Sequence, residues 1–334
     1  MPRRGSSRGK TTVITQKISL RDVMQGSRKF LLMKMGKTLF GVNLEVTQQC
    51  NLRCDFCGYW RQRRREQRLE NYVPIIRHLN PLHLTITGGE PLLRTDLEEI
   101  IYALRTQAPF IYMNLITNGS LLSVDRALSL WRAGLNQLSI SLDFPDERHD
   151  QHRGRAGLWR HLERLFAQLA ETEMDNLSLN TVIMKENLGY LLEIAKRAKK
   201  WGFKVSYSTY NPFKTNNSNH LIPKPLLRAL GHELEALIAW KHRYNNITNS
   251  NFYLKNVLRY FHEGGIPGCL AGRKWVQVSP DGTLRRCPDR EKLGSWRQFR
   301  PNHVAFTACQ ECWYACRGEA EAPLGLKRII ELNR

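Results

Sequence analysis

Three cysteines close together near residue 50 restrict what this chain can fold into more than any other feature. Cys50, Cys54 and Cys57 have the spacing C-x3-C-x2-C and directly follow an apolar stretch, 39–46, that predicts a strand. A loop this short can bring three thiolates to one face of an iron–sulfur cube. Because a 4Fe–4S cluster has four irons, three protein ligands would leave one iron open.

Other uses of three neighbouring cysteines fit this segment less well. A structural zinc ion prefers four ligands, and the nearest histidines are His78 and His83, of which His83 lies inside the next predicted strand. Disulfides form in oxidising compartments, but the start of the chain has no apolar signal-peptide core. We therefore expect a cytoplasmic protein whose thiols stay reduced and bind a metal cluster.

A glycine-rich turn follows the second predicted strand, 82–87. It consists of Gly88, Gly89 and Glu90, followed by Pro91. Two glycines let the backbone approach a ligand closely, and the neighbouring carboxylate can accept hydrogen bonds from an ammonium group.

Together, the two motifs resemble those of the radical S-adenosylmethionine (SAM) enzymes. That family places an aromatic residue before the third cysteine, and Phe56 occupies this position. The resemblance implies that Cys50, Cys54 and Cys57 hold a 4Fe–4S cluster whose open iron binds the methionine part of SAM. It also implies reductive cleavage of SAM to a 5′-deoxyadenosyl radical, which abstracts a hydrogen atom from a substrate.

Strands and helices are predicted to alternate from residue 39 onward. The strand-like segments are 39–46, 82–87, 110–116, 135–142, 177–184 and 203–208, and the helix-like segments between them are 66–79, 96–107, 124–133, 157–172 and 187–200. Six successive β/α units predict an α/β fold, a partial (β/α)6 barrel of the TIM type, and the resemblance implies the same. Functional residues of such barrels gather at the C-terminal ends of the strands, where both motifs lie.

The resemblance also implies SAM contacts at the ends of the third and fourth strands. The candidate SAM-binding residues are Phe56, Gly88, Gly89, Glu90, Asn118, Ser141, Asp143 and Arg153. Of these, Phe56 would pack beside the adenine, and the strand-end polar groups would hold the ribose and the carboxylate. Alternation along the strand puts Ser141 and Asp143 on one face. Arg153 would either pair with the SAM carboxylate or brace its own loop, and the sequence leaves both uses open.

Five further cysteines lie near the C-terminal end of the chain: Cys269, Cys287, Cys309, Cys312 and Cys316. A hairpin turn at Asp281-Gly282 would bring the first two together, and the C-x2-C pair can complete a four-thiolate site. The pattern resembles the SPASM/twitch extension of radical SAM enzymes, which implies an auxiliary 4Fe–4S cluster. Structural zinc suits the same thiolates. The fifth thiol, Cys316, would replace one of the four or stay free.

The segments divide the chain into four predicted parts. These are a basic tail and amphipathic helix (1–38), the barrel (39–210), a connector with helices (211–262) and a cysteine-rich β-hairpin/helix extension (263–334). The N-terminal helix, within 20–36, is expected to pack on the barrel or, alternatively, to lie on an anionic membrane surface. The Pro-punctuated start of the connector, 211–225, would be a lid or a linker.

The chain is strongly basic, with a formal net charge of +21 from 51 Lys and Arg against 30 Asp and Glu. This charge and the arginine-rich run 61–68 support an alternative, a zinc-stabilised nucleic-acid-binding protein. That alternative leaves the six β/α units and the Gly88–Glu90 turn unexplained. We therefore predict a radical SAM iron–sulfur oxidoreductase. It would act on a small molecule or a peptide and receive electrons from a donor such as flavodoxin or ferredoxin.

Overall fold

A curved sheet of eight strands forms the centre of the molecule. The computed structural model describes residues 20–61, 66–213 and 215–323, and every structural statement below concerns these residues. The strands are β1 (Gly41–Thr47), β2 (His83–Gly88), β3 (Tyr112–Thr117), β4 (Gln137–Ser141), β5 (Leu177–Ile183), β6 (Lys204–Thr209), β7 (Trp275–Val278) and β8 (Leu284–Arg285). Their order is β6-β5-β4-β3-β2-β1-β7-β8, and only β8 runs antiparallel to its neighbour. All six strands predicted for the barrel are present, and the predicted α/β partial barrel is confirmed.

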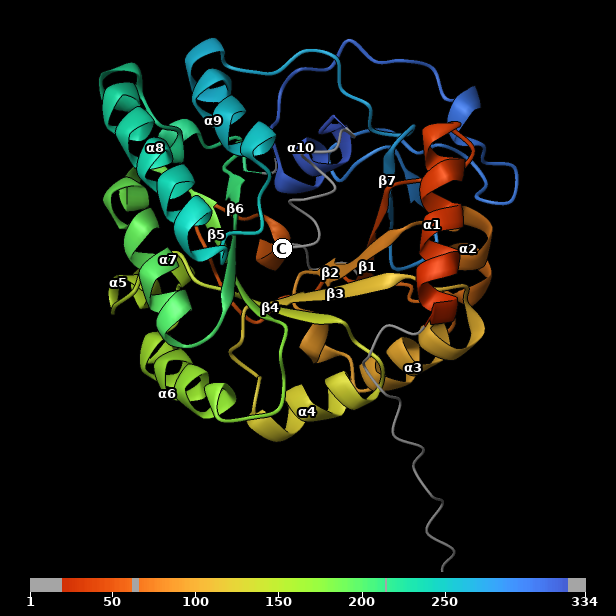
Figure 1. The fold of residues 1–334 in the computed structure, drawn as a ribbon, viewed down its shortest axis with the longest axis horizontal. Helices are drawn as coiled ribbons and strands as arrows, with labels where there is room; N and C mark the ends of the chain where they lie inside the picture. The colour runs from red at the N-terminus through yellow and green to blue at the C-terminus, as the bar shows by residue number, and fades with distance from the viewer. Residues whose placement is uncertain (1–19, 62–65, 214, 324–334) are drawn as a thin grey trace, which may run out of the picture.

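Helices pack around the outside of this sheet (Figure 1). They are α1 (Leu20–Lys34), α2 (Val73–Leu79), α3 (Leu97–Gln107), α4 (Val124–Arg132), α5 (Arg148–Arg153), α6 (Leu158–Ala170), α7 (Leu191–Lys200), α8 (Leu227–Tyr244), α9 (Asn251–Glu263) and α10 (Ala315–Glu321). A 3-10 segment, Lys185–Tyr190, precedes α7. Among the described residues, no helix combines the length and the apolar character that crossing a membrane requires.

The predicted helix 66–79 is too long, because helix α2 begins only at Val73. The backbone before it contacts the turn between β7 and β8 instead, where the amide of Leu69 donates to the carbonyl of Pro280 at 2.9 Å. Pro74 near the helix start fixes this boundary, since proline fits the first turn of a helix but not its interior.

Alternation along the strands separates two environments. Ile140 and Leu142, at the end of β4, are both 0% exposed and belong to the apolar core under the helices. The intervening positions are polar and face the inside of the barrel, where the hydroxyl of Ser139 donates to Asn114 at 2.9 Å. The face of a parallel sheet that helices cover needs apolar side chains. The side chains on the other face can be polar, because they line a cavity.

The C-terminal hairpin forms as predicted, but its first strand extends the central sheet. Strand β7 pairs in parallel with β1, with Trp275 opposite Gly41. The turn at Asp281 and Gly282 then reverses the chain into β8, and Gly282 has the positive φ of +82° that such a turn requires. The sheet therefore runs across the boundary predicted at residue 263.

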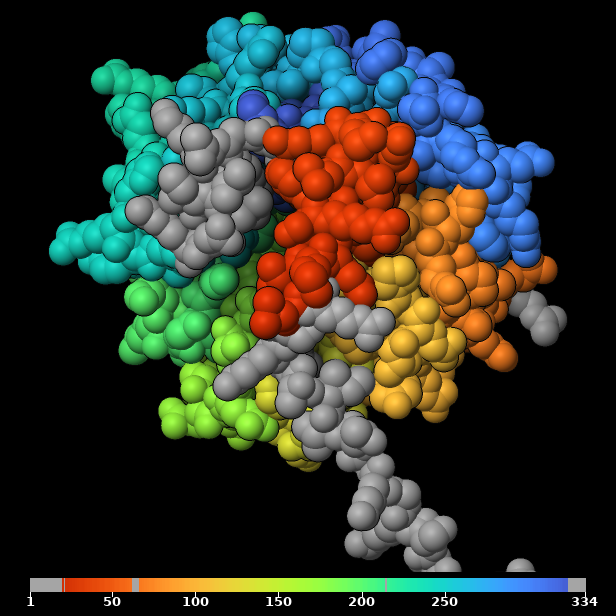
Figure 2. Space-filling view, turned by 45° about the vertical axis from the view of Figure 1, so that its right-hand side comes forward, coloured from red at the N-terminus to blue at the C-terminus, as the bar shows by residue number. Residues whose placement is uncertain are grey.

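Helix α1 is attached to the N-terminal ends of two strands. The ammonium of Lys29, which is 3% exposed, donates to the carbonyls of Pro81 at 2.9 Å and Phe110 at 2.6 Å, just before β2 and β3. Figure 2 shows this helix lying across the visible face of the molecule. Packing of α1 on the barrel is thus observed, and burial lowers the pKa of Lys29 to about 8.

We expect the substitution Lys29→Met to destabilise the folded protein by about 1–3 kcal/mol, because two carbonyls would lose their buried donor. The measurement is the thermal unfolding midpoint of the cluster-loaded protein. The matched control is Arg28→Met, on an exposed part of the same helix, which should change stability by less than about 0.5 kcal/mol. Equal effects of the two substitutions would show that the Lys29 contacts do not hold α1 in place.

Candidate active site

The glycine turn and the cysteine loop are in direct backbone contact at the ends of β1 and β2. The amide of Gly89 donates to the carbonyl of Thr47 at 2.8 Å. A Cβ atom on Gly88 would lie 2.1 Å from that carbonyl oxygen, and one on Gly89 would lie 2.2 Å from the carbonyl oxygen of Gln49. Any side chain would push away the segment that leads to Cys50. The two glycines were predicted to let a ligand come close to the backbone. In this structure they let the protein's own residues Thr47 and Gln49 come close instead.

The carboxylate of Glu90 links the ends of β2 and β3. It is 0% exposed and accepts hydrogen bonds from the Thr117 hydroxyl at 2.6 Å, the Asn118 amide at 2.7 Å and the Leu92 amide at 3.0 Å. Burial raises the pKa of this carboxyl group, although the hydrogen bonds act in the opposite direction. The side chain of Asn118 in turn donates to Asn51 at 3.0 Å, inside the cysteine loop. A contact of Glu90 with the SAM ammonium group stays a prediction.

The three cysteines of the first group lie on one compact loop. Cys54 is buried, whereas Cys50 and Cys57 are partly exposed, and the amide of Cys57 donates to the carbonyl of Cys54 at 3.3 Å. Burial, together with the nearby thiols of Cys57 and Cys50, raises the pKa of Cys54 to about 12. Without a bound metal, Cys54 would therefore be a neutral thiol at pH 7, and metal binding would release its proton.

The donor set of this loop fits a cluster of several irons. Within the described part of the chain, no three His, Cys, Asp or Glu side chains surround a point that a single metal ion could occupy. Each thiolate ligand of a cubane binds a different iron, so cluster ligands need not converge on one point. Three soft donors on a short loop, one of them buried, fit that arrangement.

The ring of Phe56 lies in a box of aromatic and cationic groups. It stacks on His152, with ring centroids 4.4 Å apart and planes at 15°, and the Arg153 guanidinium lies 5.1 Å from its centroid. His220 meets it edge-on at 6.3 Å. The predicted contact of Phe56 with adenine stays a prediction, but the structure places the ring at the barrel mouth with defined neighbours.

Sequence reasoning did not identify His220, which lies in the connector between β6 and α8. Its Nδ1 atom is 3.1 Å from the carboxylate of Glu186, and its Nε2 atom is 3.4 Å from that of Asp55, inside the cysteine loop. The connector therefore reaches back to the barrel mouth at this residue. No periodicity marks such a contact, because it joins two irregular segments far apart in sequence.

Asp143 and Arg153 form a buried ion pair beside the cysteine loop. The guanidinium Nε donates to the Asp143 carboxylate at 2.8 Å, and the second carboxylate oxygen accepts from the Val182 amide at 2.9 Å. Burial alone would raise the pKa of Asp143, but the charge of Arg153 and the nearby imidazoles hold it below its ordinary value. The carbonyl of Arg153 also faces the Cys54 thiol at 3.7 Å. Arg153 thus braces the loop, and its contact with the SAM carboxylate stays a prediction.

A cavity of about 490 Å³ occupies the inside of the barrel and connects the two groups of cysteines. Phe56 and Cys57 line its wall at the barrel mouth, while Cys316 and Glu319 line it on the C-terminal side. Ser141, the remaining strand-end candidate, is buried and pairs in register with Asn180, which lines the cavity. Among the described residues that line it, there is no lysine or arginine.

Four of the five C-terminal cysteines gather beside β7. Cys269 is buried, and Cys287, Cys309 and Cys316 pack against its cluster. Burial, with neighbouring thiols such as Cys269 contributing, raises the pKa of Cys316 to about 11. Cys316 thus lies with the others and also borders the barrel cavity.

Two arginines hold the segment that carries the last three of these cysteines. Arg317 is 0% exposed and donates to the carbonyl of Cys312 at 2.6 Å. Arg290 donates to the thiol of Cys309 at 3.5 Å. These cations favour the negative charge that four thiolates would carry.

Comparison with known proteins agrees with this site. Residues 44–198 match the Radical SAM superfamily model. The GTP 3′,8-cyclase of Aquifex aeolicus is 31% identical over 188 residues, which cover 54% of this chain and only half, 50%, of that protein. The PqqA peptide cyclase of Rhizobium meliloti is 25% identical over 295 residues, covering 84% of this chain and 76% of the relative. Residues 44–198 thus form a radical SAM domain, and the relatives support a radical SAM enzyme.

A solved structure shows the same fold. SuiB of Streptococcus suis bound to S-adenosylmethionine superposes with a TM-score of 0.62 at 17% identity, over 83% of this chain and 69% of SuiB. The radical SAM domain implies a 4Fe–4S cluster and SAM, and Cys50, Cys54 and Cys57 are the residues that would hold that cluster.

The Gly89→Ala substitution tests the contact between the two motifs. The added Cβ would collide with backbone atoms, so we expect the cysteine loop to shift, with a cost of at least about 1–3 kcal/mol and a lower iron content after anaerobic reconstitution. The control is Gly189→Ala, where a Cβ would meet nothing within 4 Å. Normal iron content and stability in Gly89→Ala would refute a structural need for this glycine.

Proposed function

We propose that this enzyme modifies a peptide substrate oxidatively inside the barrel cavity, between a SAM-cleaving cluster and an auxiliary cluster. The observation that carries the proposal is that Cys57 and Cys316 border the same cavity, on opposite sides. When bound, the first cluster supplies the electron that splits SAM into methionine and a 5′-deoxyadenosyl radical. The protein's own residues supply the positions of the reactants and the exclusion of water.

The first cysteine loop keeps its shape through three contacts. The Gly88–Glu90 turn supports its start, the Asp143–Arg153 pair supports its centre, and His220 lies against Asp55. With the loop so fixed, SAM would lie over the barrel mouth, near Phe56 and the strand ends at Asn118 and Ser141.

The auxiliary cluster would be held by four of the five C-terminal cysteines. Its place beside the cavity would let it accept an electron from the substrate radical, which would make the net reaction an oxidation such as a dehydrogenation or a cross-link. A zinc ion at the same thiolates is the competing occupant, although no three of the described thiols surround a single point in this structure. The first cluster would draw its electron from a separate donor protein such as flavodoxin or ferredoxin.

The charge of the cavity supports a peptide over an anionic small molecule. A nucleoside triphosphate or a polycarboxylate would need cationic partners, and the described lining offers none. The ionisable acids there are Glu45, which accepts a hydrogen bond from Tyr59, and Glu319, which accepts one from the amide of Ser250. Two relatives also act on or bind peptides by their names, a PqqA peptide cyclase and SuiB bound to its precursor peptide SuiA.

The SAM-cleaving step is tested by measuring 5′-deoxyadenosine from anaerobic, dithionite-reduced protein with SAM. We expect product from the wild type and none from Cys54→Ala, because the loop would lose its buried ligand. Product from Cys54→Ala at the wild-type rate would contradict the assignment of this loop.

The auxiliary site is tested by Cys269→Ala, since Cys269 is the buried member of its group. We expect SAM cleavage to persist while the iron content falls from about eight to about four per chain. Zinc in place of the missing iron, or about four irons already in the wild type, would show that no auxiliary iron–sulfur cluster exists.

The substrate class is tested by asking which compounds stimulate 5′-deoxyadenosine formation. We expect mixed short peptides of neutral or basic composition to raise the rate, while GTP and acidic peptides of the same length do not. Stimulation by GTP without stimulation by any peptide would overturn the substrate proposal and leave SAM cleavage intact.

A further inference from the structure

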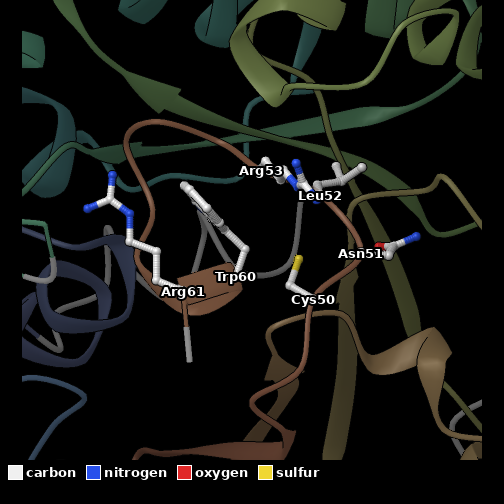
Figure 3. Close-up of a pocket in the computed structure, with 6 residues that line it drawn as sticks. All are labelled: Cys50, Asn51, Leu52, Arg53, Trp60 and Arg61. Carbon is white, nitrogen blue, oxygen red and sulfur yellow. The ribbon is translucent and has the colours of Figure 1, made fainter. Parts of the chain in front are cut away.

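A second cavity lies against the cysteine loop, separate from the barrel interior. Its volume is about 550 Å³, and it is lined by Cys50, Asn51, Leu52, Arg53, Trp60 and Arg61 (Figure 3). None of these residues lines the barrel cavity, which meets the loop at Phe56 and Cys57. The loop is therefore approached from two directions, and Cys50 is the cysteine on the wall of this second cleft.

The described residues that line this cleft include two arginines and no acid. Arg53 and Arg61 are both exposed, and Figure 3 shows them on opposite sides of Trp60. A further exposed cation, Arg155, follows Gly154, which packs against the backbone of Arg53. The neighbouring acid of the loop, Asp55, lies 3.4 Å from His220.

The wall of the cleft is fixed to the cluster-binding loop. The indole of Trp60 donates to the carbonyl of Cys54 at 2.8 Å, and the guanidinium of Arg61 lies 4.9 Å from the indole ring. A molecule bound in this cleft would thus contact residues whose backbone holds the cluster ligands, without entering the barrel.

We propose that this cleft is the docking site of an acidic one-electron carrier protein of the flavodoxin type. The inference rests on the proposed function, because that reaction consumes an electron for each SAM cleaved. The barrel cavity is occupied by SAM and substrate in that reaction, so the donor needs another approach to the cluster. The cleft offers one beside Cys50, with cations that would steer an acidic surface toward it.

The electron count of this step balances. The anionic hydroquinone of the two-electron-reduced flavodoxin gives up one electron to the cluster and becomes the neutral semiquinone, with no change in bound protons. The net charge of the 4Fe–4S core falls from 2+ to 1+.

The test uses the full cluster-loaded chain and a two-electron-reduced flavodoxin, followed by stopped-flow absorbance of the flavin. We expect the double substitution Arg53→Glu/Arg61→Glu to slow flavin oxidation about tenfold or more at low ionic strength, because steering would turn into repulsion. The difference from the wild type should shrink as salt is added. The control is Arg132→Glu/Arg228→Glu, which changes net charge equally at exposed positions of α4 and α8 and should match the wild type.

A small reductant separates docking from cluster loss. Dithionite should produce the same reduced-cluster electron paramagnetic resonance signal in all three proteins. If dithionite gives that signal and flavodoxin reduces Arg53→Glu/Arg61→Glu as fast as the wild type, the docking proposal is overturned. If dithionite gives no signal even in the wild type, the proposed function fails together with it. Should the double variant not fold, Arg53→Gln/Arg61→Gln is used, with a smaller slowing expected and an unchanged rate again overturning the proposal.

Discussion

The close packing of the Gly88–Gly89 turn on the backbone of residues 47–49 is the contact on which the site depends. Two parallel strands end side by side here, and the chain after each has to turn away within a few residues. Because a Cβ atom at either glycine would lie about 2 Å from a carbonyl oxygen, only glycine allows both turns. The cysteine loop therefore begins at a position set by the sheet itself. A loop that is anchored to rigid strands is positioned more precisely than a loop without such support.

The same loop separates two environments of opposite character. Its inner side meets a cavity whose described lining has no lysine or arginine, although the whole chain carries a net charge of +21. Its outer side meets a cleft bordered by Arg53 and Arg61. The positive charge thus lies outside the barrel, where an acidic protein can meet it. A neutral or cationic substrate group fits the inside better than an anionic one. Under the proposed function, this arrangement would give electrons and substrate separate routes to one cluster.

Much of the fold could be predicted because alternation of apolar and polar residues is a local property. The six barrel strands and the hairpin at Asp281-Gly282 follow from such patterns. The cysteine loop and the glycine turn could be predicted because their chemistry requires neighbouring residues. The pairing of β7 with β1 could not be predicted, because no local sequence feature of either strand specifies which strand it pairs with. Pro74 marks the start of α2 at Val73, but the contact of the preceding backbone with the distant hairpin could not be predicted.

The contacts that hold the site are long-range and could not be predicted for the same reason. Asp143 and Arg153 were both candidates for SAM, yet their pairing with each other depends on how α5 packs against the end of β4. His220 joins Asp55 across more than half the barrel sequence. Burial makes such pairs important, because an unpaired charge in the interior is costly. A sequence shows which residues carry charge, but only the fold shows which of them meet.

The central claim is that Cys50, Cys54 and Cys57 hold a cluster with one iron open to SAM. The most direct measurement is the electron paramagnetic resonance spectrum of the reduced protein, recorded before and after SAM is added, in a variant that lacks Cys269. If the claim holds, the spectrum of the single remaining cluster changes when SAM binds to the open iron. A reduced cluster whose spectrum is the same with saturating SAM would contradict it.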